Sequence, residues 1–193
     1  MFSTVRLETD KKQFVVFPFA NDIAKKSIQG KVLDNIRVSE GEGKASEPSA
    51  FLLPDERIQI TREMPDWQNA IRMASAPLLD NGFINRNYIE KAIDMVETDK
   101  RFIMIADGVI IAHAGVDDGV YSMGMALLKL PEKLSFNGYM DADIIVVLAT
   151  PDKTRHLPAL YQLFDLLEDE GNISAMRRAQ DAHEIARLIR KYI

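Results

Sequence analysis

The chain has 193 residues, of which 47% are hydrophobic and 27% charged, as in a globular protein with a substantial core. It contains no cysteine, which excludes disulfides, a thiolate nucleophile and a cysteine-ligated zinc site. A net charge of −5 without a dense Lys/Arg cluster argues against direct contact with nucleic acid. With no signal peptide and no apolar segment long enough to cross a bilayer, we expect a cytosolic protein without membrane insertion.

The first part of the chain is too small to fold alone. Its apolar run at 14–19 (FVVFPF) predicts a strand end, and a helix is expected to begin near Ile23. The sequence then becomes small and charged (SEGEGKASEPS), as in flexible linkers. We therefore expect a tail fragment of a preceding domain at 1–38, a linker at 39–54 and the main domain at 55–193.

Two helices are expected at the start of the main domain. The first follows Asp66, and Pro77 predicts that it ends or kinks there. Asn85 is expected to cap the second helix, which spans 86–96 and has Tyr88 on its inward face.

The periodicity then changes to short apolar runs separated by Gly, Pro and Asp-Gly, which predict buried strands. Helical periodicity returns near His156. This order favours an α/β fold, a mixed central β-sheet flanked by helices. The predicted strands are 101–106, 109–112, 123–130 and 143–149, and the predicted helices are 156–167, 173–179 and 181–192.

Three histidines are candidates for chemistry. His183 lies on a charged terminal helix and is expected to be an ordinary surface residue. His113 follows an apolar strand and precedes an acidic, Gly-flanked loop, a place where α/β folds put reacting groups. His156 opens a helix, whose first turn is a natural anion site. By position alone, the simpler interpretations are favoured, namely that His113 bonds a loop carbonyl and that His156 is an ordinary first-turn residue.

Other chemistries find little support. The sequence has no Walker loop, no GxGxxG after a strand, no HExxH and no GxSxG. His113, Asp117 and His156 have suitable ligand types for a metal, but their spacing matches no known signature, so no metal is expected.

The segments GVIIAHAGVDDGV, SMGMALLKL and VVLATPDKTRHLPALYQLFDLL resemble the active-site region of fructose/mannitol-type (type 2) enzyme IIA domains of the bacterial sugar phosphotransferase system. The opening helices, WQNAIRMASAPLLDNGFINRNYIEKAIDMV, resemble that family as well. The resemblance covers about 66–193 and implies the enzyme IIA sandwich fold and a phosphotransferase that carries phosphohistidine.

The resemblance also implies roles for individual residues. His113 would be phosphorylated, His156 would help hold the phosphoryl group, and Asp117 falls where relatives often have a glutamate. The donor would be the phosphocarrier protein HPr, the partner an enzyme IIB or IIB-like domain, and no cofactor would be required. Two positions depart from the pattern: Ala112 stands where many members have proline, and only Arg101 offers a substitute for an arginine after the second helix.

Three functions stay open. The variant IAHA…DDGV…GM is more similar to IIA-like domains of antiterminator-type transcriptional regulators, in which residues 1–38 would end a IIB-like domain. In that case phosphorylation of His113 would regulate transcription. The alternatives are a sugar-transport enzyme IIA that passes phosphate to enzyme IIB, and a non-catalytic interaction domain with this fold.

Overall fold

The structure is a computed structural model in which contacts divide the chain into two units, Met1–Ala45 and Ser46–Ile193. In the first unit, β1 (Val5–Thr9) pairs antiparallel with β2 (Lys12–Val16). The helix expected from Ile23 and residues 39–51 of the expected linker lie outside the described residues. The structure describes residues 5–9, 12–16, 52–98, 103–152 and 155–192.

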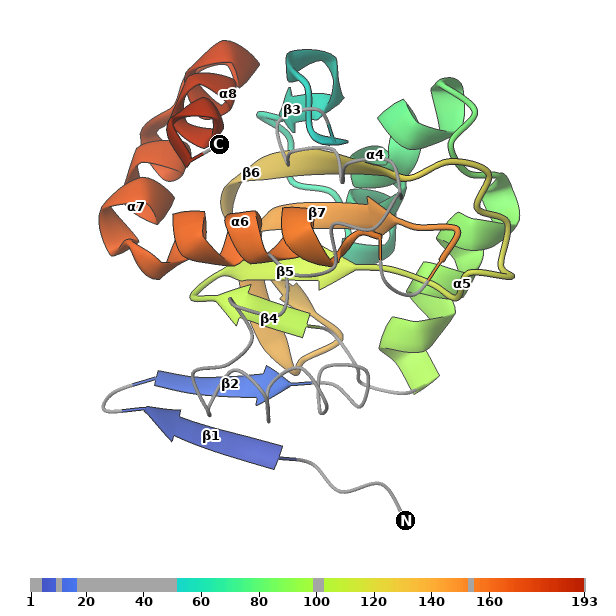
Figure 1. The fold of residues 1–193 in the computed structure, drawn as a ribbon, viewed down its shortest axis with the longest axis horizontal. Coiled ribbons are helices and arrows are strands. Elements are labelled where there is room, and N and C mark those ends of the chain that lie inside the picture. Colours follow the sequence, from blue (N-terminus) through green and yellow to red (C-terminus); the bar gives the residue numbers. More distant parts are fainter. Residues whose placement is uncertain (1–4, 10–11, 17–51, 99–102, 153–154, 193) are drawn as a thin grey trace, which may run out of the picture. The chain divides into compact units, whose positions relative to one another are not determined.

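The second unit is built on one mixed sheet of five strands in the order β3-β6-β7-β5-β4 (Figure 1). The pairs β3–β6 and β5–β7 are parallel, and the pairs β6–β7 and β4–β5 are antiparallel. The α/β fold with a mixed sheet and flanking helices is therefore confirmed. The strands are β3 (Ile58–Ile60), β4 (Ile103–Ala106), β5 (Val109–Ala112), β6 (Gly124–Phe136) and β7 (Met140–Ala149).

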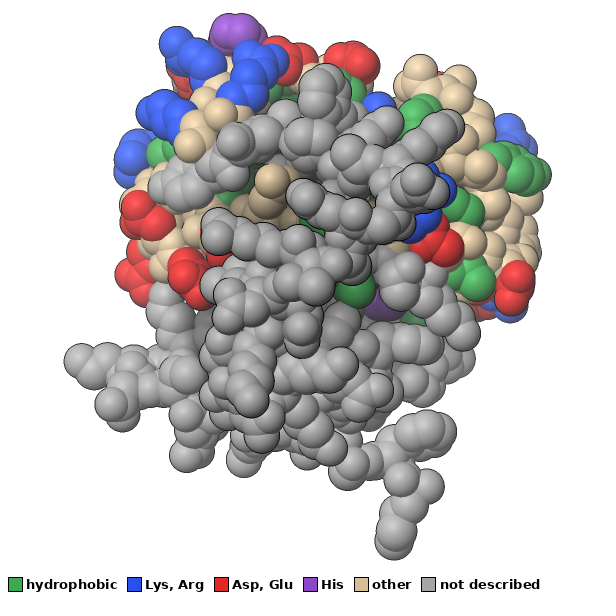
Figure 2. Space-filling view, viewed as in Figure 1, with side chains coloured by type: hydrophobic (Ala, Val, Ile, Leu, Met, Phe, Trp, Pro, Cys, Tyr) green, Lys and Arg blue, Asp and Glu red, His purple; other side chains and the backbone are tan. Residues whose placement is uncertain are grey.

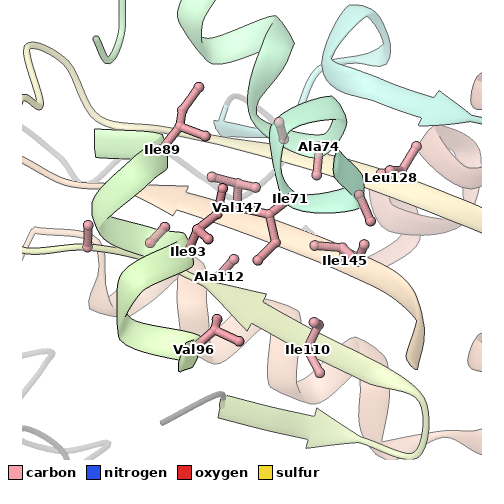
Figure 3. Close-up of a cluster of buried hydrophobic side chains, with 14 of the residues drawn as sticks. Ile71, Ala74, Ile89, Ile93, Val96, Ile110, Ala112, Leu128, Ile145 and Val147 are labelled. Carbon is pink, nitrogen blue, oxygen red and sulfur yellow. The ribbon is translucent and has the colours of Figure 1, made fainter. Parts of the chain in front are cut away.

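Helices cover both faces of this sheet, with α4 behind it and α6 in front in Figure 1. Because strand side chains alternate between faces, Ile145 and Val147 of β7 join the core under α4 and α5 (Figure 3), whereas Ile144 and Val146 join the core on the other face. Burial on both faces explains why the strands are almost continuously apolar. The helices are α4 (Trp67–Asp80), α5 (Arg86–Thr98), α6 (Leu157–Glu168), α7 (Glu170–Arg178) and α8 (Ala182–Ile189).

Short 3-10 turns flank the second unit at each end: η1 (Asp55–Arg57) precedes β3, and η2 (Arg190–Tyr192) ends the stretch predicted as one helix at 181–192. In the view of Figure 2, Lys and Arg side chains gather over the C-terminal helices, with acidic side chains beside them. None of the helices in the described part of the chain has the length and apolar character that crossing a membrane requires.

The first helix begins as predicted but does not end at its proline. The Asp66 carboxylate accepts from the Asn69 N–H at 2.8 Å and caps α4, which continues through Pro77 to Asp80. Proline has no N–H for the Met73 carbonyl one turn earlier. The Gln59 side-chain amide donates to that carbonyl instead, at 2.8 Å. A residue of β3 therefore supplies the hydrogen bond that Pro77 cannot make.

The strand predicted at 123–130 is too short, and β3 is not predicted at all. β6 continues through Pro131 to Phe136. β3 pairs only with residues 127–129, and the β6–β7 register shifts between Lys129 and Leu134. This half of β6 is thus an irregular edge, where a proline is tolerated and charged side chains are exposed. β3 has only three residues, too few for a periodic signal.

Candidate functional site

The topology of the sheet brings His113 and His156 to one edge. β5 and β7 run parallel with Ala112 opposite Val147, so their carboxyl ends meet at the same edge. His113 is the first residue after β5, and His156 is the N-cap of α6, which follows β7. We call this edge the carboxyl end of the β5–β7 pair.

The two histidines are close enough to influence each other. Burial lowers the pKa of His113 from its ordinary value, and the nearby His156 lowers the pKa further. Burial also lowers the pKa of His156, against the opposing charge and backbone of Asp152. Both rings are consequently neutral at pH 7, the form in which an imidazole nitrogen has a free lone pair and acts as a nucleophile.

His156 has an unsatisfied atom at this edge. Its Nδ1 is buried and has no hydrogen-bond partner among the described residues. The preceding turn is closed by Asp152, whose carboxylate accepts from the Arg155 N–H at 2.7 Å and whose carbonyl accepts from the Thr150 hydroxyl. A buried polar atom without a partner is costly unless a ligand supplies one. At a helix N-terminus, that ligand is favoured to be an anion.

The loop that follows His113 is held by the start of α5. The Asn85 N–H donates to the Gly119 carbonyl at 2.9 Å, and its side-chain amide donates to the Tyr121 hydroxyl at 3.0 Å. Asn87 donates to the Asp118 carbonyl at 2.9 Å. Gly119 has φ +109°, and a Cβ there would lie 2.1 Å from Asn85 Oδ1. The loop is thus fixed by backbone-directed hydrogen bonds that need Asn85 and Gly119 together.

The two adjacent aspartates of this loop differ. Asp118 Oδ2 accepts from the Gly115 N–H at 2.7 Å and so closes the turn after His113. Asp117 is exposed, four residues after His113, and the role implied for it by resemblance stays a prediction. Arg101 lies outside the described residues.

Sequence reasoning placed Tyr88 on the inward face of its helix but missed its hydroxyl. The side chain is fully buried, and the hydroxyl accepts from the Ala114 N–H at 3.1 Å and donates to the Leu148 carbonyl. Burial raises the pKa of this phenol, which therefore stays neutral. A tyrosine on an inward helix face is itself the missed signal, because a buried phenol requires a polar partner.

The third histidine lies apart from these contacts. His183 is exposed on α8, and its Nδ1 is 3.0 Å from Asp55 Oδ2, which confirms it as a surface residue. Within the described ranges, no group of three or more His, Asp or Glu side chains is arranged to hold a metal ion.

Comparisons with known proteins agree with this geometry. The chain is 28% identical over 141 residues to the ascorbate-specific PTS system EIIA component of Salmonella typhi, covering 72% of this chain and 92% of the relative. It is also 28% identical over 137 residues to the mannitol-specific cryptic phosphotransferase enzyme IIA component of Escherichia coli K12, covering 70% and 93%. Both relatives are named as EIIA components of phosphotransferase systems.

Solved structures share the fold. The solution structure of the mannitol-specific cryptic enzyme IIA from Escherichia coli has a TM-score of 0.69 and 26% identity, covering 75% of this chain and 99% of that one. The enzyme IIA in a complex of IIAMTL and phosphorylated IIBMTL from Escherichia coli has a TM-score of 0.61 and 19% identity, covering 70% and 95%.

The family model described as "Phosphoenolpyruvate-dependent sugar phosphotransferase system, EIIA 2" matches residues 51–192. This range includes the whole sheet, both layers of helices and the edge that carries the two histidines. The chain belongs to the EIIA 2 family of the phosphoenolpyruvate-dependent sugar phosphotransferase system.

Proposed function

We propose that this chain is an EIIA phosphocarrier that accepts a phosphoryl group on His113 from HPr and passes it to an enzyme IIB partner. The observation that carries the proposal is the pair of neutral histidines at one sheet edge, where His156 has a buried Nδ1 without a partner among the described residues. No metal or organic cofactor is needed for this transfer.

The reaction exchanges one P–N bond for another. A neutral ring nitrogen of His113 attacks the phosphorus of the donor's phosphohistidine in line, and the donor imidazole leaves as the new bond forms. Such a transfer depends on positioning and charge stabilisation more than on further covalent help. Burial favours the reactive form, because it lowers the pKa of His113 and keeps the ring unprotonated.

His156 is suited to hold the transferred group. In one tautomer its Nδ1 carries a proton and can donate to a phosphoryl oxygen, which would satisfy the atom that has no partner in the described structure. The N-terminus of α6 adds positive potential at the same place. Asp117 is exposed on the loop that follows His113.

The proposed acceptor is an enzyme IIB, which would take the phosphoryl group on a cysteine. Two EIIA components match this chain over nine-tenths of their own length, and one structure with this fold was solved with phosphorylated enzyme IIB bound. These likenesses support the transport alternative; none of them supports a role in an antiterminator-type regulator.

The test is transfer of labelled phosphate from phosphorylated HPr to the full chain. We expect label on the wild type and on His183→Ala, the matched control with an exposed histidine. We expect none on His113→Ala and slow labelling of His156→Ala. Labelled wild type is then mixed with candidate enzyme IIB proteins, and we expect one of them to remove the label.

Two results would contradict the proposal. Label on a folded His113→Ala protein would show that another residue carries the phosphate. A folded wild type that takes no label from HPr would leave the non-catalytic interaction domain as the better interpretation.

A further inference from the structure

We infer that the Tyr88 hydroxyl is the positioning group that sets the backbone of His113 relative to β7. The inference rests on the proposed function of His113 and adds a residue on α5 to the site. Tyr88 does not touch the reacting nitrogen. It acts through Ala114, the residue after His113, and through Leu148, near the end of β7.

The register of the sheet shows what the hydroxyl replaces. Ala112 lies opposite Val147, so a continued parallel ladder would place Ala114 opposite Ala149 and direct its N–H to the Leu148 carbonyl. Instead, the Ala114 N–H donates to the Tyr88 oxygen at 3.1 Å, and the Tyr88 O–H donates to the Leu148 carbonyl. One phenol oxygen thus stands in place of the next rung, and β5 separates from β7 at His113.

This bridge is rigid because all three parts are anchored. Tyr88 is 0% exposed, and its own N–H is held by Asn85 Oδ1 at 3.2 Å. Asn85 also holds the far end of the His113 loop through the Gly119 carbonyl. The first turn of α5 therefore fixes the loop after His113 at two places, and Tyr88 is the contact that links it to β7.

Positioning of this kind matters for in-line attack, because a displacement of about 1 Å can cost roughly a hundredfold in rate. Removing the hydroxyl leaves the Ala114 N–H and the Leu148 carbonyl without the partner that joins them. The strands are then free to close the missing rung or to draw in water, and either change moves His113 relative to His156.

The experiment compares Tyr88→Phe with Tyr161→Phe. Tyr161 is a partly buried tyrosine on α6 whose hydroxyl makes no hydrogen bond among the described residues. For Tyr88→Phe we expect phosphoryl transfer from HPr to fall by about tenfold to a hundredfold. We also expect faster hydrogen exchange at the Ala114 amide and a His113 pKa that moves up toward 6.5 as the ring gains solvent. The Tyr161→Phe protein keeps the wild-type values.

These readouts separate positioning from general stability, since a purely structural loss lowers the melting temperature without changing the His113 titration in the folded protein. If Tyr88→Phe does not fold, 3,5-difluorotyrosine at position 88 keeps the ring and the oxygen but alters both hydrogen bonds. We then expect the rate of phosphoryl transfer to change at least about twofold. The control, 3,5-difluorotyrosine at position 161, should leave this rate unchanged.

A folded Tyr88→Phe protein with wild-type transfer rate and wild-type Ala114 exchange would overturn the inference. Unchanged transfer with difluorotyrosine at position 88 would do the same. If the wild type accepts no phosphate, the proposed function fails, while Ala114 exchange and the His113 titration still decide whether Tyr88 positions the loop.

Discussion

The two ends of the β5–β7 pair differ in the partners of their charged side chains. At the amino end, Arg177 contacts both oxygens of the buried Asp143, at 2.6 and 2.9 Å. It also donates to the Asp107 carbonyl, while Lys133 pairs with the Asp107 carboxylate at 2.9 Å. At the carboxyl end, the Asp118 and Asp152 carboxylates accept from backbone N–H groups instead of pairing with basic side chains. Asparagine and tyrosine side chains hold the loop, and the two histidines are neutral.

This difference separates stability from function along one pair of strands. A buried charge must be paired inside the protein unless a ligand will pair with it. The amino end satisfies its charges internally and is therefore complete without a ligand. The carboxyl end has two neutral histidine rings and a polar atom without a described partner, so an incoming phosphoryl group would meet a hydrogen-bond donor there, while the Asp152 carboxylate near His156 already accepts from the Arg155 N–H.

The largest expected effect is on rate and belongs to the carboxyl end. His156→Ala removes the proposed donor to the phosphoryl oxygens, and we expect transfer from HPr to slow by about 10²- to 10³-fold. Stability should change little, because the lost Nδ1 has no described partner. Single-turnover labelling and a thermal melt measure the two quantities. A strong loss of stability at an unchanged rate would reverse the comparison.

A substitution at the amino end should lower stability and leave the transfer rate unchanged. Arg177→Ala leaves the Asp143 carboxylate buried without its bidentate partner, and we expect unfolding to become easier by about 2 to 4 kcal/mol. Transfer from HPr to the folded protein should be unchanged. Urea denaturation provides the measurement, and Arg178→Ala, an exposed neighbour on α7, is the matched control with almost no effect.

The two ends of the β5–β7 pair should also contribute to stability in different pH ranges. His113 and His156 have pKa values below 6.5 in the folded protein, so below pH 6.5 the unfolded chain binds more protons. Their contribution to stability is complete above that pH and is lost as the pH falls toward the folded values. The pKa of Asp107 is also lowered, mainly by Lys133, but its contribution is lost only below about pH 3.8.

We therefore expect a His113→Gln/His156→Gln protein to lose the pH dependence of stability that begins below pH 6.5 and to keep the acid transition below about pH 3.8. Denaturation curves at half-unit pH steps provide the measurement. An unchanged slope in the double variant would mean that the two histidines are not the groups that titrate there.

The smallest effect is expected for the exposed ion pair. Lys133 and Asp107 retain 41% and 76% of their side-chain exposure, so water screens their attraction. Lys133→Ala should cost about 0.5 kcal/mol or less, and the difference from wild type should shrink further in 0.5 M salt. A loss as large as that of Arg177→Ala would show that the cluster acts as one unit.

The sequence was sufficient for the parts of this molecule with strong periodicity. β5 has the predicted bounds, and the predicted caps Asp66 and Asn85 make the expected hydrogen bonds. That His113 lies at the edge of a sheet followed from an apolar run ending at a Gly-flanked loop. Its proximity to His156 came from the family resemblance, because the parallel pairing of β5 and β7 cannot be read from either strand alone.

What the sequence did not reveal depends on contacts between distant residues. Gln59 donates to the Met73 carbonyl across 14 positions. Pro77 predicts the end of a helix only as long as this distant hydrogen bond is unknown. Tyr88 reaches Leu148 across 60 positions, so periodicity describes it only as an inward residue. Local patterns carry no information on either partner.

The hairpin of β6 and β7 also bears on the order of folding. Its strands are joined by three residues, with Asn137 and Gly138 at positive φ, so it can close at little cost in chain entropy. β3 must instead find residues 127–129 from about 70 positions away. We expect the hairpin to form early and β3 to dock late, so nascent β6 spends time with an open edge, and its Pro131, Glu132 and Lys133 would then discourage pairing with a second chain.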